Sequence, residues 1–301
     1  MIKAKNNQLP HPDFSAETQA KWKRDFFFIQ AADTQLGLMY NFGTDGSDGT
    51  PYPESNWEKE IDLCKASVEI LNGMNPKPEF FIVCGDLVDA FADKWPEIRQ
   101  RQEKDLKEIY SKLSPEIPMI CVCGNHDIGN SPTKETIDMY QASFGDDYFS
   151  FYKNGCCFIV INSQFYEDAS NVPDLYKRHE SWLESEMQAA SDRGVEHIVL
   201  FQHIPWFVES PDEEKIYFNV EKELRMKKLE QFHKAGVRKI FCGHYHRNAG
   251  GFYKDLEVVV TSAIGCQIGP DQHGMRVVKV RKAGLEHQYH PLDNFPMRVT
   301  L

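Results

Sequence analysis

The chain has 301 residues, 41% of them hydrophobic, and its 45 acidic against 34 basic side chains give a formal net charge of −11. This composition is typical of a globular protein, and its acidity argues against nucleic acid or an anionic membrane surface as a general partner. No apolar run reaches the roughly 20 residues of a membrane helix, and the polar N-terminus lacks a secretory signal. We therefore expect a cytoplasmic protein, with a monomer as the default state.

The 8 cysteines also favour a reducing compartment. Cys121 and Cys123 alternate along one expected strand, and Cys156 directly precedes Cys157, which does not suit a framework of structural disulfides. Because the chain has no Cys-x-x-Cys pair, a thiolate zinc site is not expected either. We expect reduced, buried thiols.

The expected elements alternate between apolar strands and amphipathic helices. Residues 1–25 are polar and form an N-terminal extension, whereas residues 26–301 are expected to form a single domain because no linker divides them. Segment 41–56 is rich in glycine, serine, proline and aspartate, which predicts a long loop. Asn154 and Gly155 predict the turn of a hairpin over 148–163. The other predicted elements are helices over 58–74, 96–114, 175–193 and 220–235, and strands within 25–33, 79–86, 117–123, 196–201 and 237–242.

The C-terminal third predicts consecutive antiparallel strands between residues 251 and 292. The earlier strands are continuous apolar runs, which indicates burial on both faces. Together these patterns predict an α/β fold in which two mixed β-sheets pack as a sandwich with helices outside, a four-layer αββα arrangement.

Five of the expected strands end in side chains that commonly bind metals. In open α/β sheets, sites gather in the crevice beyond the carboxyl ends of the strands, where ligands from separate strands can converge. The rigidity of a buried strand also fixes the geometry of the ligand that it carries. The residues are Asp33 and Gln35, Asp86, Asn125 and His126, His203, and His244 and His246.

Each of these residues has an ordinary explanation when it is taken alone. Asp33 or Asp86 can cap a helix, and Asn125 can occupy a turn beside a glycine. A lone His203 before Ile-Pro is usually a core histidine, and the Gly-His-Tyr-His pair can be an exposed loop. If there were no shared site, each of five strand ends would have acquired a metal-binding side chain by accident. The combination therefore favours a shared metal centre.

The donor set indicates more than one ion. Two aspartates, an asparagine, a glutamine and three histidines are too many ligands for one tetrahedral zinc ion, and they suit two ions that share a carboxylate. Nitrogen and oxygen donors without thiolate are compatible with two divalent ions of Mn, Fe, Zn or Mg. Such a pair clamps the attacking and leaving oxygens of a phosphoryl transfer.

The order Asp-x-Gln, Gly-Asp-x-x-Asp, Gly-Asn-His-Asp, His and Gly-His-x-His resembles the calcineurin-like metallophosphoesterase superfamily over roughly residues 26–290. The combination of motifs is highly specific, although each motif alone is weak. The resemblance implies a dinuclear centre in a β-sandwich flanked by helices. It also implies a phosphoric monoester hydrolase that removes phosphate from phosphoserine or phosphothreonine in proteins.

The resemblance assigns the candidate ligands to two ions that share Asp86. The family pattern implies that one ion is bound by Asp33, Gln35, Asp86 and His246, and the other by Asp86, Asn125, His203 and His244. Gln35 departs from the pattern, because many superfamily members have histidine there. A neutral carboxamide oxygen binds borderline metals less tightly, so we expect a weakly held ion.

His126 matches the family histidine that protonates the leaving alcohol oxygen. In some members this acid is oriented by the second aspartate of Gly-Asp-x-x-Asp, which is Asp89 here. A carboxylate in that position would hold the imidazolium and raise its pKa. Asp127 is the competing orienter, with the alternative that it only ties down its own loop.

Asn125 and Arg247 are the candidates for substrate binding. The Arg247 guanidinium, next to Asn248, can form a fork with phosphate oxygens, and a surface ion pair is the equal alternative. The substrate implied is a phosphoprotein or a small phosphate ester. A phosphodiesterase acting on nucleotides or lipid head groups remains an alternative, and the complete ligand set argues against a non-catalytic scaffold.

Two segments are candidates for the rim of the site. The acidic loop 41–56 and the tract 162–176 both follow strands of the expected sheets. Phe165 and Tyr166 in the second tract are possible rim contacts, although aromatic residues after a strand usually pack in the core. An acidic rim would favour a substrate with basic residues near the phosphate.

Overall fold

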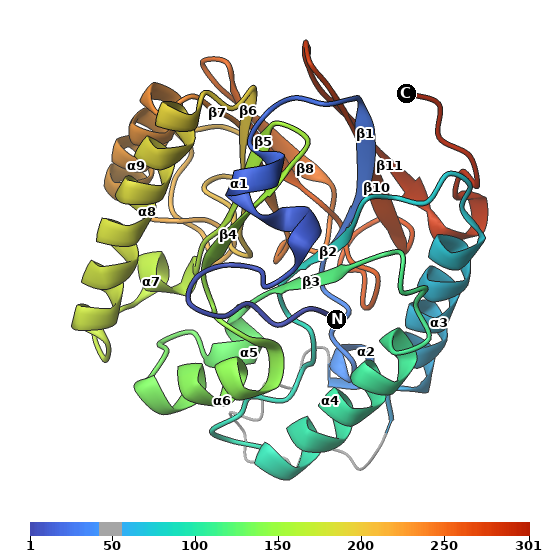
Figure 1. The fold of residues 1–301 in the computed structure, drawn as a ribbon. Coiled ribbons are helices and arrows are strands. Elements are labelled where there is room, and N and C mark those ends of the chain that lie inside the picture. Colours follow the sequence, from blue (N-terminus) through green and yellow to red (C-terminus); the bar gives the residue numbers. More distant parts are fainter. Residues whose placement is uncertain (42–55) are drawn as a thin grey trace.

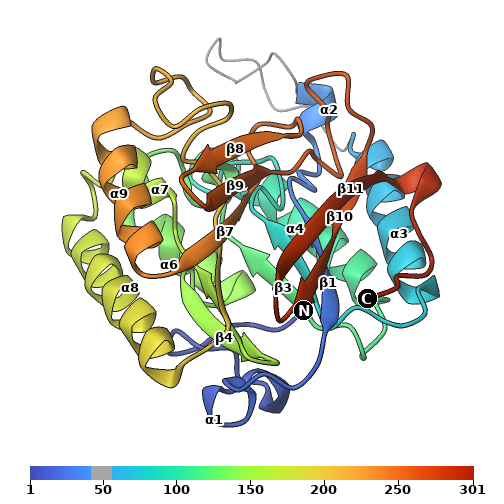
Figure 2. The same cartoon turned by 90° about the horizontal axis from the view of Figure 1, so that it is seen from above.

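The computed structural model describes residues 1–41 and 56–301, so the predicted long loop at 41–56 lies outside the described residues except at its two ends. Two mixed β-sheets pack face to face, and helices cover both outer faces (Figure 1). Viewed from above, α8 and α9 lie on one side of the sandwich and α3 on the other (Figure 2). The predicted α/β sandwich is confirmed.

The first sheet has the strand order β11-β10-β1-β2-β3. Its strands are β1 (Phe26–Ala31), β2 (Phe81–Cys84), β3 (Met119–Val122), β10 (Gly274–Arg281) and β11 (Gly284–Pro291). β1, β2 and β3 are parallel, whereas β10 is antiparallel to both of its neighbours. The helices that cover this sheet are α3 (Glu58–Gly73), α4 (Pro96–Tyr110) and α6 (Lys134–Phe144), the last of which the sequence analysis did not predict.

The second sheet has the order β4-β5-β6-β7-β9-β8. Its strands are β4 (Phe149–Lys153), β5 (Cys156–Val160), β6 (His197–Phe201), β7 (Val237–Cys242), β8 (Ala249–Tyr253) and β9 (Leu256–Val260), and its outer face is covered by α8 (Pro173–Arg193) and α9 (Lys222–Lys234). The predicted hairpin turn joins β4 to β5, with φ of 46° at Asn154 and 87° at Gly155. Positive φ at both central residues is the geometry that an Asn-Gly hairpin turn requires.

Phenylalanine rings fill the space between the two sheets. Phe28 stacks on Phe80 with centroids 4.5 Å apart, and Phe158 lies 5.2 Å from Phe80 and 5.9 Å from Phe201. All these rings are fully buried, and each contributes about 1.5–3 kcal/mol by leaving water. This core holds the two sheets, and therefore the ends of their strands, in a fixed relation.

The C-terminal strands do not form one continuous antiparallel run. β8 and β9 form a hairpin in the second sheet, where β9 is parallel to β7, whereas β10 and β11 form a hairpin in the first sheet beside β1. The alternation of apolar and polar residues along the strands predicts each hairpin, but it does not indicate which of the two sheets the hairpin joins.

Residues 1–25 lie against the end of the sandwich. The short helices η1 (Pro12–Phe14) and α1 (Ala16–Gln19) pack near β4, and the buried Phe14 ring contacts Phe80 and Phe151. The other short helices are α2 (Leu38–Asn41), α5 (Asn125–Ile128), α7 (Gln164–Glu167) and η2 (Leu292–Asn294). Within residues 1–41 and 56–301, every helix is too short or too polar to cross a membrane. All eight cysteines are buried and free, as expected.

Candidate metal centre

The side chains that follow β1, β2, β3, β6 and β7 converge at one point. His203 Nε2 lies 3.1 Å from Asp86 Oδ2, 3.0 Å from Asn125 Oδ1 and 3.2 Å from His244 Nδ1. His246 Nε2 lies 3.5 Å from Asp33 Oδ1, whose carboxylate also accepts the His244 backbone N–H at 3.1 Å. Five strands from two sheets thus deliver their polar ends to a single place.

The carboxylates and imidazoles form two clusters that share one residue. Asp86, His203 and His244 make the first cluster, and Asp33, Asp86 and His246 make the second. In each cluster the ligand atoms lie within 4.8 Å of one another, and every member is buried. A shared carboxylate between two nitrogen-containing clusters is the arrangement that a pair of divalent ions requires.

Gln35 gives a separate test of whether these residues fit metal ions. Its Nε2 donates to Asp89 Oδ1 at 3.2 Å, and this hydrogen bond fixes the nitrogen side of the carboxamide. Its Oε1 is buried and has no hydrogen-bond partner among the described residues. An unpaired buried oxygen is costly in a protein, and a cation bound beside it would remove that cost.

Strand ends can meet this closely because the motifs that carry the candidate ligands contain glycine. A Cβ on Gly124 would lie 2.2 Å from Asp86 Oδ1, and a Cβ on Gly243 would lie 2.6 Å from Asp33 Oδ2. Five of the candidate ligands also occupy the left-handed region of backbone conformation, which is unfavourable for residues with a side chain. The φ angles are 52° at Asp33, 30° at Gln35, 47° at Asp86, 69° at His244 and 54° at His246.

Backbone carbonyls orient all four histidines of the site. In each case one ring nitrogen donates to a carbonyl oxygen, which leaves the other nitrogen with its lone pair for a ligand or a proton. The pairs are His203 Nδ1 with Cys84 O at 2.9 Å, His244 Nε2 with Tyr217 O at 3.3 Å, His246 Nδ1 with Cys266 O at 2.5 Å and His126 Nδ1 with Asp89 O at 2.6 Å.

Burial and mutual contacts shift the pKa values of the carboxylates and imidazoles of the site, and a bound cation would have to displace the protons that the shifts of Asp33 and His203 favour. Burial opposes ionisation of Asp86, but the neighbouring histidines, led by His203, hold the pKa of Asp86 well below its ordinary value. Burial raises the pKa of Asp33, and it lowers the pKa of His244 strongly and that of His246 to about 4. Despite burial, the Asp86 and Asp33 carboxylates raise the pKa of His203 to about 9. His244 and His246 are therefore neutral at pH 7, as metal ligands must be.

His126 lies beside the two clusters and belongs to neither. Its backbone N–H donates to Asp86 Oδ1 at 2.8 Å, its ring lies tilted by 32° against Phe91 with centroids 4.4 Å apart, and its side chain is 18% exposed. Asp89 Oδ1 lies 3.3 Å from His126 Nδ1. Asp127 instead accepts the backbone N–H groups of Leu87 and Gly124, so it ties down its own loop.

The candidate substrate residues differ in their surroundings. The Arg247 guanidinium donates to the Ile268 carbonyl at 2.9 Å and lies over the Tyr245 ring, and among residues 1–41 and 56–301 no carboxylate pairs with it. Asn248 accepts from Arg276 at 2.7 Å and is part of the packing.

Of the two alternatives for Phe165 and Tyr166 in the tract 162–176, the structure shows core packing and not contact with the rim. Phe165 and Tyr166 are both buried, and the Tyr166 hydroxyl donates to Glu180 at 2.7 Å. Two aromatic residues that the sequence analysis did not single out lie at the site instead, namely Phe91 against His126 and Tyr217 against His244. Neither belongs to a motif, so only their contacts reveal them.

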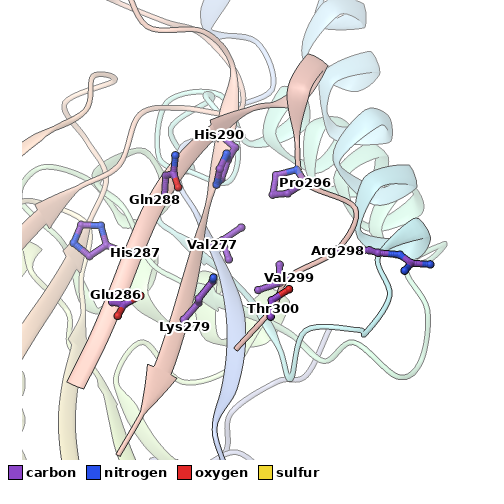
Figure 3. A pocket seen from close by; sticks show the side chains of 10 residues that line it. All are labelled: Val277, Lys279, Glu286, His287, Gln288, His290, Pro296, Arg298, Val299 and Thr300. Carbon is purple, nitrogen blue, oxygen red and sulfur yellow. The ribbon is translucent and has the colours of Figure 1, made fainter. Parts of the chain in front are cut away.

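A pocket of about 360 Å³ lies elsewhere, beside β10, β11 and the C-terminal residues (Figure 3). Its lining includes Val277, Lys279, Gln288 and Val299, but none of the sequence-predicted site residues. The Arg298 side chain at its edge points away from Val277 (Figure 3). This pocket is therefore separate from the metal-ligand clusters.

Comparison with known proteins agrees with this geometry. The family model described as calcineurin-like phosphoesterase matches residues 28–248. The serine/threonine-protein phosphatase CPPED1 of Bos taurus is 47% identical over 281 residues, which cover 93% of this chain and 88% of that protein. CPPED1 of Homo sapiens is 46% identical over 282 residues, with the same coverage of 93% and 88%.

Two solved structures share the fold at low sequence identity. A dimetal phosphatase from Danio rerio has a TM-score of 0.56 and 12% identity, covering 88% of this chain and 99% of that one. Purple acid phosphatase PPD1 of yellow lupin has a TM-score of 0.59 and 10% identity, covering 92% of this chain and 53% of that one.

The fold, the paired Asp/His clusters and the phosphatase relatives define a metal-dependent phosphoesterase, which is a hydrolase. The chain belongs to the calcineurin-like phosphoesterase family.

Proposed function

We propose that this enzyme hydrolyses phosphoric monoesters and that its substrates are phosphoserine and phosphothreonine in proteins. The observation that carries the proposal is the pair of buried clusters sharing Asp86, with the His126 imidazole directly beside them. In this proposal one ion is held by Asp33, Gln35, Asp86 and His246, and the other by Asp86, Asn125, His203 and His244. When bound, two divalent ions supply positive charge for the phosphoryl oxygens and acidify the attacking water.

His126 is the general acid in this proposal. Donation from Nδ1 to the Asp89 carbonyl directs Nε2 away from Asp89, and Nε2 has no hydrogen-bond partner among the described residues. A proton on Nε2 can therefore pass to the leaving alcohol oxygen of a serine or threonine ester. Asp89 is a positioning residue, because its carbonyl and carboxylate both lie against the same ring nitrogen.

The substrate class rests on the phosphatase relatives and on charge. The names of the relatives specify serine/threonine-protein phosphatases. Asn125 and Arg247 are the proposed phosphate contacts, and Arg247 is already held in place by the Ile268 carbonyl. The net charge of −11 disfavours nucleic acid and anionic membranes as partners. We place the enzyme in the cytoplasm as a monomer, in agreement with its eight free thiols.

A comparison of three substrates tests the proposal. The full chain, loaded with Mn²⁺, should hydrolyse p-nitrophenyl phosphate and phosphoserine peptides but turn over bis-p-nitrophenyl phosphate much more slowly. Asp86→Asn, which removes the shared carboxylate, should abolish hydrolysis and the binding of at least one ion, and it controls for contaminating phosphatases. Faster turnover of the diester would replace the monoesterase with a phosphodiesterase. Absence of any metal-dependent hydrolysis would favour a scaffold.

A further inference from the structure

Tyr217 contacts two of the proposed ligands of one metal ion, although it lies outside every motif. Its hydroxyl lies 3.4 Å from Asn125 Nδ2, and its backbone carbonyl accepts from His244 Nε2 at 3.3 Å. Its ring lies against the His244 imidazole, with centroids 5.1 Å apart. One residue thus reaches a ligand after β3 and a ligand after β7.

These contacts decide which atoms of the two ligands face the centre. Because Asn125 Nδ2 donates to the Tyr217 hydroxyl, the carboxamide oxygen Oδ1 is directed toward His203 Nε2, 3.0 Å away. Only that oxygen, and not the amide nitrogen, can bind a cation. The Tyr217 carbonyl likewise holds the His244 proton on Nε2, which leaves the Nδ1 lone pair facing the same cluster.

The loop that carries Tyr217 is held rigidly. In this Tyr217 loop, residues 208–220, the Glu213 carboxylate accepts the backbone N–H groups of Val208, Glu209 and Ser210 at 2.8–3.0 Å. Asn219 Oδ1 accepts the N–H of residue 216 at 2.8 Å.

Arg225 on α9 also holds the Tyr217 loop, through hydrogen bonds to its backbone. Its buried guanidinium donates to the carbonyls of residues 211, 213 and 220 at 2.8–3.1 Å. Tyr217 itself is 57% exposed, so burial of its side chain does not hold it in place. The rigid loop positions its backbone, and the contacts with Asn125 and His244 account for its direction.

We propose that Tyr217 is a positioning residue for the ion bound by Asp86, Asn125, His203 and His244, an inference that rests on the proposed function. The hydroxyl orders the Asn125 carboxamide before the metal binds. Loss of the hydroxyl should therefore lower the affinity for that one ion and leave the affinity for the ion at Asp33, Gln35 and His246 unchanged. Outer hydrogen bonds of this kind typically change metal affinity by about 10–100-fold.

The test measures Mn²⁺ binding to the metal-free full chain by calorimetry and by electron paramagnetic resonance. Tyr217→Phe removes only the hydroxyl and retains the ring and the carbonyl, and we expect it to weaken one of two Mn²⁺ sites by about 10-fold or more. Asn125→Ala identifies that site by weakening the same binding step. In the Asn125→Ala background, Tyr217→Phe should have no further effect on Mn²⁺ binding, because the hydroxyl no longer has the Asn125 carboxamide to orient.

Tyr253→Phe is the matched control. It deletes a phenol hydroxyl that donates to Glu230 at 2.8 Å, away from the metal centre, and it should leave both Mn²⁺ affinities unchanged. Unchanged Mn²⁺ binding in Tyr217→Phe, weakening of both sites, or an effect that persists without Asn125 would each overturn the inference while the proposed function stands. A wild-type chain that bound fewer than two Mn²⁺ ions would overturn the proposed function, and the role of Tyr217 with it.

Discussion

Replacing His126 by alanine separates acid catalysis from metal binding. The imidazole belongs to neither ligand cluster, and the contact between His126 and Asp86 is made by the backbone N–H, which alanine retains. Metal content should therefore stay at the wild-type value. The ring is 18% exposed and packs mainly on Phe91, so its loss should cost only about 1 kcal/mol of stability.

The effect on turnover should be much larger. The Asp89 carbonyl, 2.6 Å from Nδ1, would fix the imidazole for the proposed proton transfer through Nε2, and positioned acid catalysis contributes about 10²–10⁴ in rate. This corresponds to about 3–5 kcal/mol of transition-state stabilisation. An alkyl phosphate needs that proton on its leaving oxygen, whereas nitrophenolate leaves without it. We therefore expect turnover of phosphoserine peptides to fall by this whole factor of about 10²–10⁴, and turnover of p-nitrophenyl phosphate to fall by less.

The assay is steady-state hydrolysis of both esters, with bound metal measured on the same samples. His233→Ala is a matched control, because His233 is a half-buried histidine on α9 whose Nε2 lies 2.6 Å from Asp255 Oδ1, and its replacement should leave both activities unchanged. An equal loss for the two esters would remove His126 from the acid role. Loss of metal from His126→Ala would show that it binds an ion.

Three further predictions follow from other parts of the molecule. Because Gln35 offers a neutral oxygen, the purified enzyme should gain activity on addition of Mn²⁺ or Mg²⁺, and Gln35→His should retain more metal through dialysis; maximal activity without any response to divalent ions would contradict this. Although burial opposes ionisation of Glu180, its contacts with His179 and Lys228 lower its pKa from 4.5 to about 2, so its stabilisation is complete above about pH 4.5 and is lost as the pH falls through about 2. Glu180→Gln should therefore cost about 3 kcal/mol at pH 7 and progressively less toward pH 2 in denaturant unfolding, and a difference independent of pH would refute the assignment. Phe158→Ala, in the packed space between the sheets, should cost about 3–5 kcal/mol of unfolding free energy, and a loss below about 1 kcal/mol would show that this core is loosely packed.

The sequence determined most of the fold because its signals are local. Continuous apolar runs predicted the central strands, and Asn154–Gly155 predicted the β4–β5 turn, since an Asn-Gly pair readily takes the required positive φ. The candidate ligands could be selected for the same reason, because each polar residue follows directly after a strand. Because the carboxyl ends of parallel strands lie at the same edge of a sheet, residues that follow such strands come close together.

Tertiary structure decided what depends on contacts between distant segments. The order of β8–β11 between the two sheets, the packing of Phe165 and Tyr166, and the separation of Asp89 from Asp127 around His126 have no local signature. The position of Tyr217 beside Asn125 is of the same kind, because it requires a loop after β6 to cross to the end of β3. The sequence shows which side chains follow each strand. The hydrogen bonds that orient those side chains are made to carbonyls and hydroxyls of distant segments, and these come together only when the chain folds.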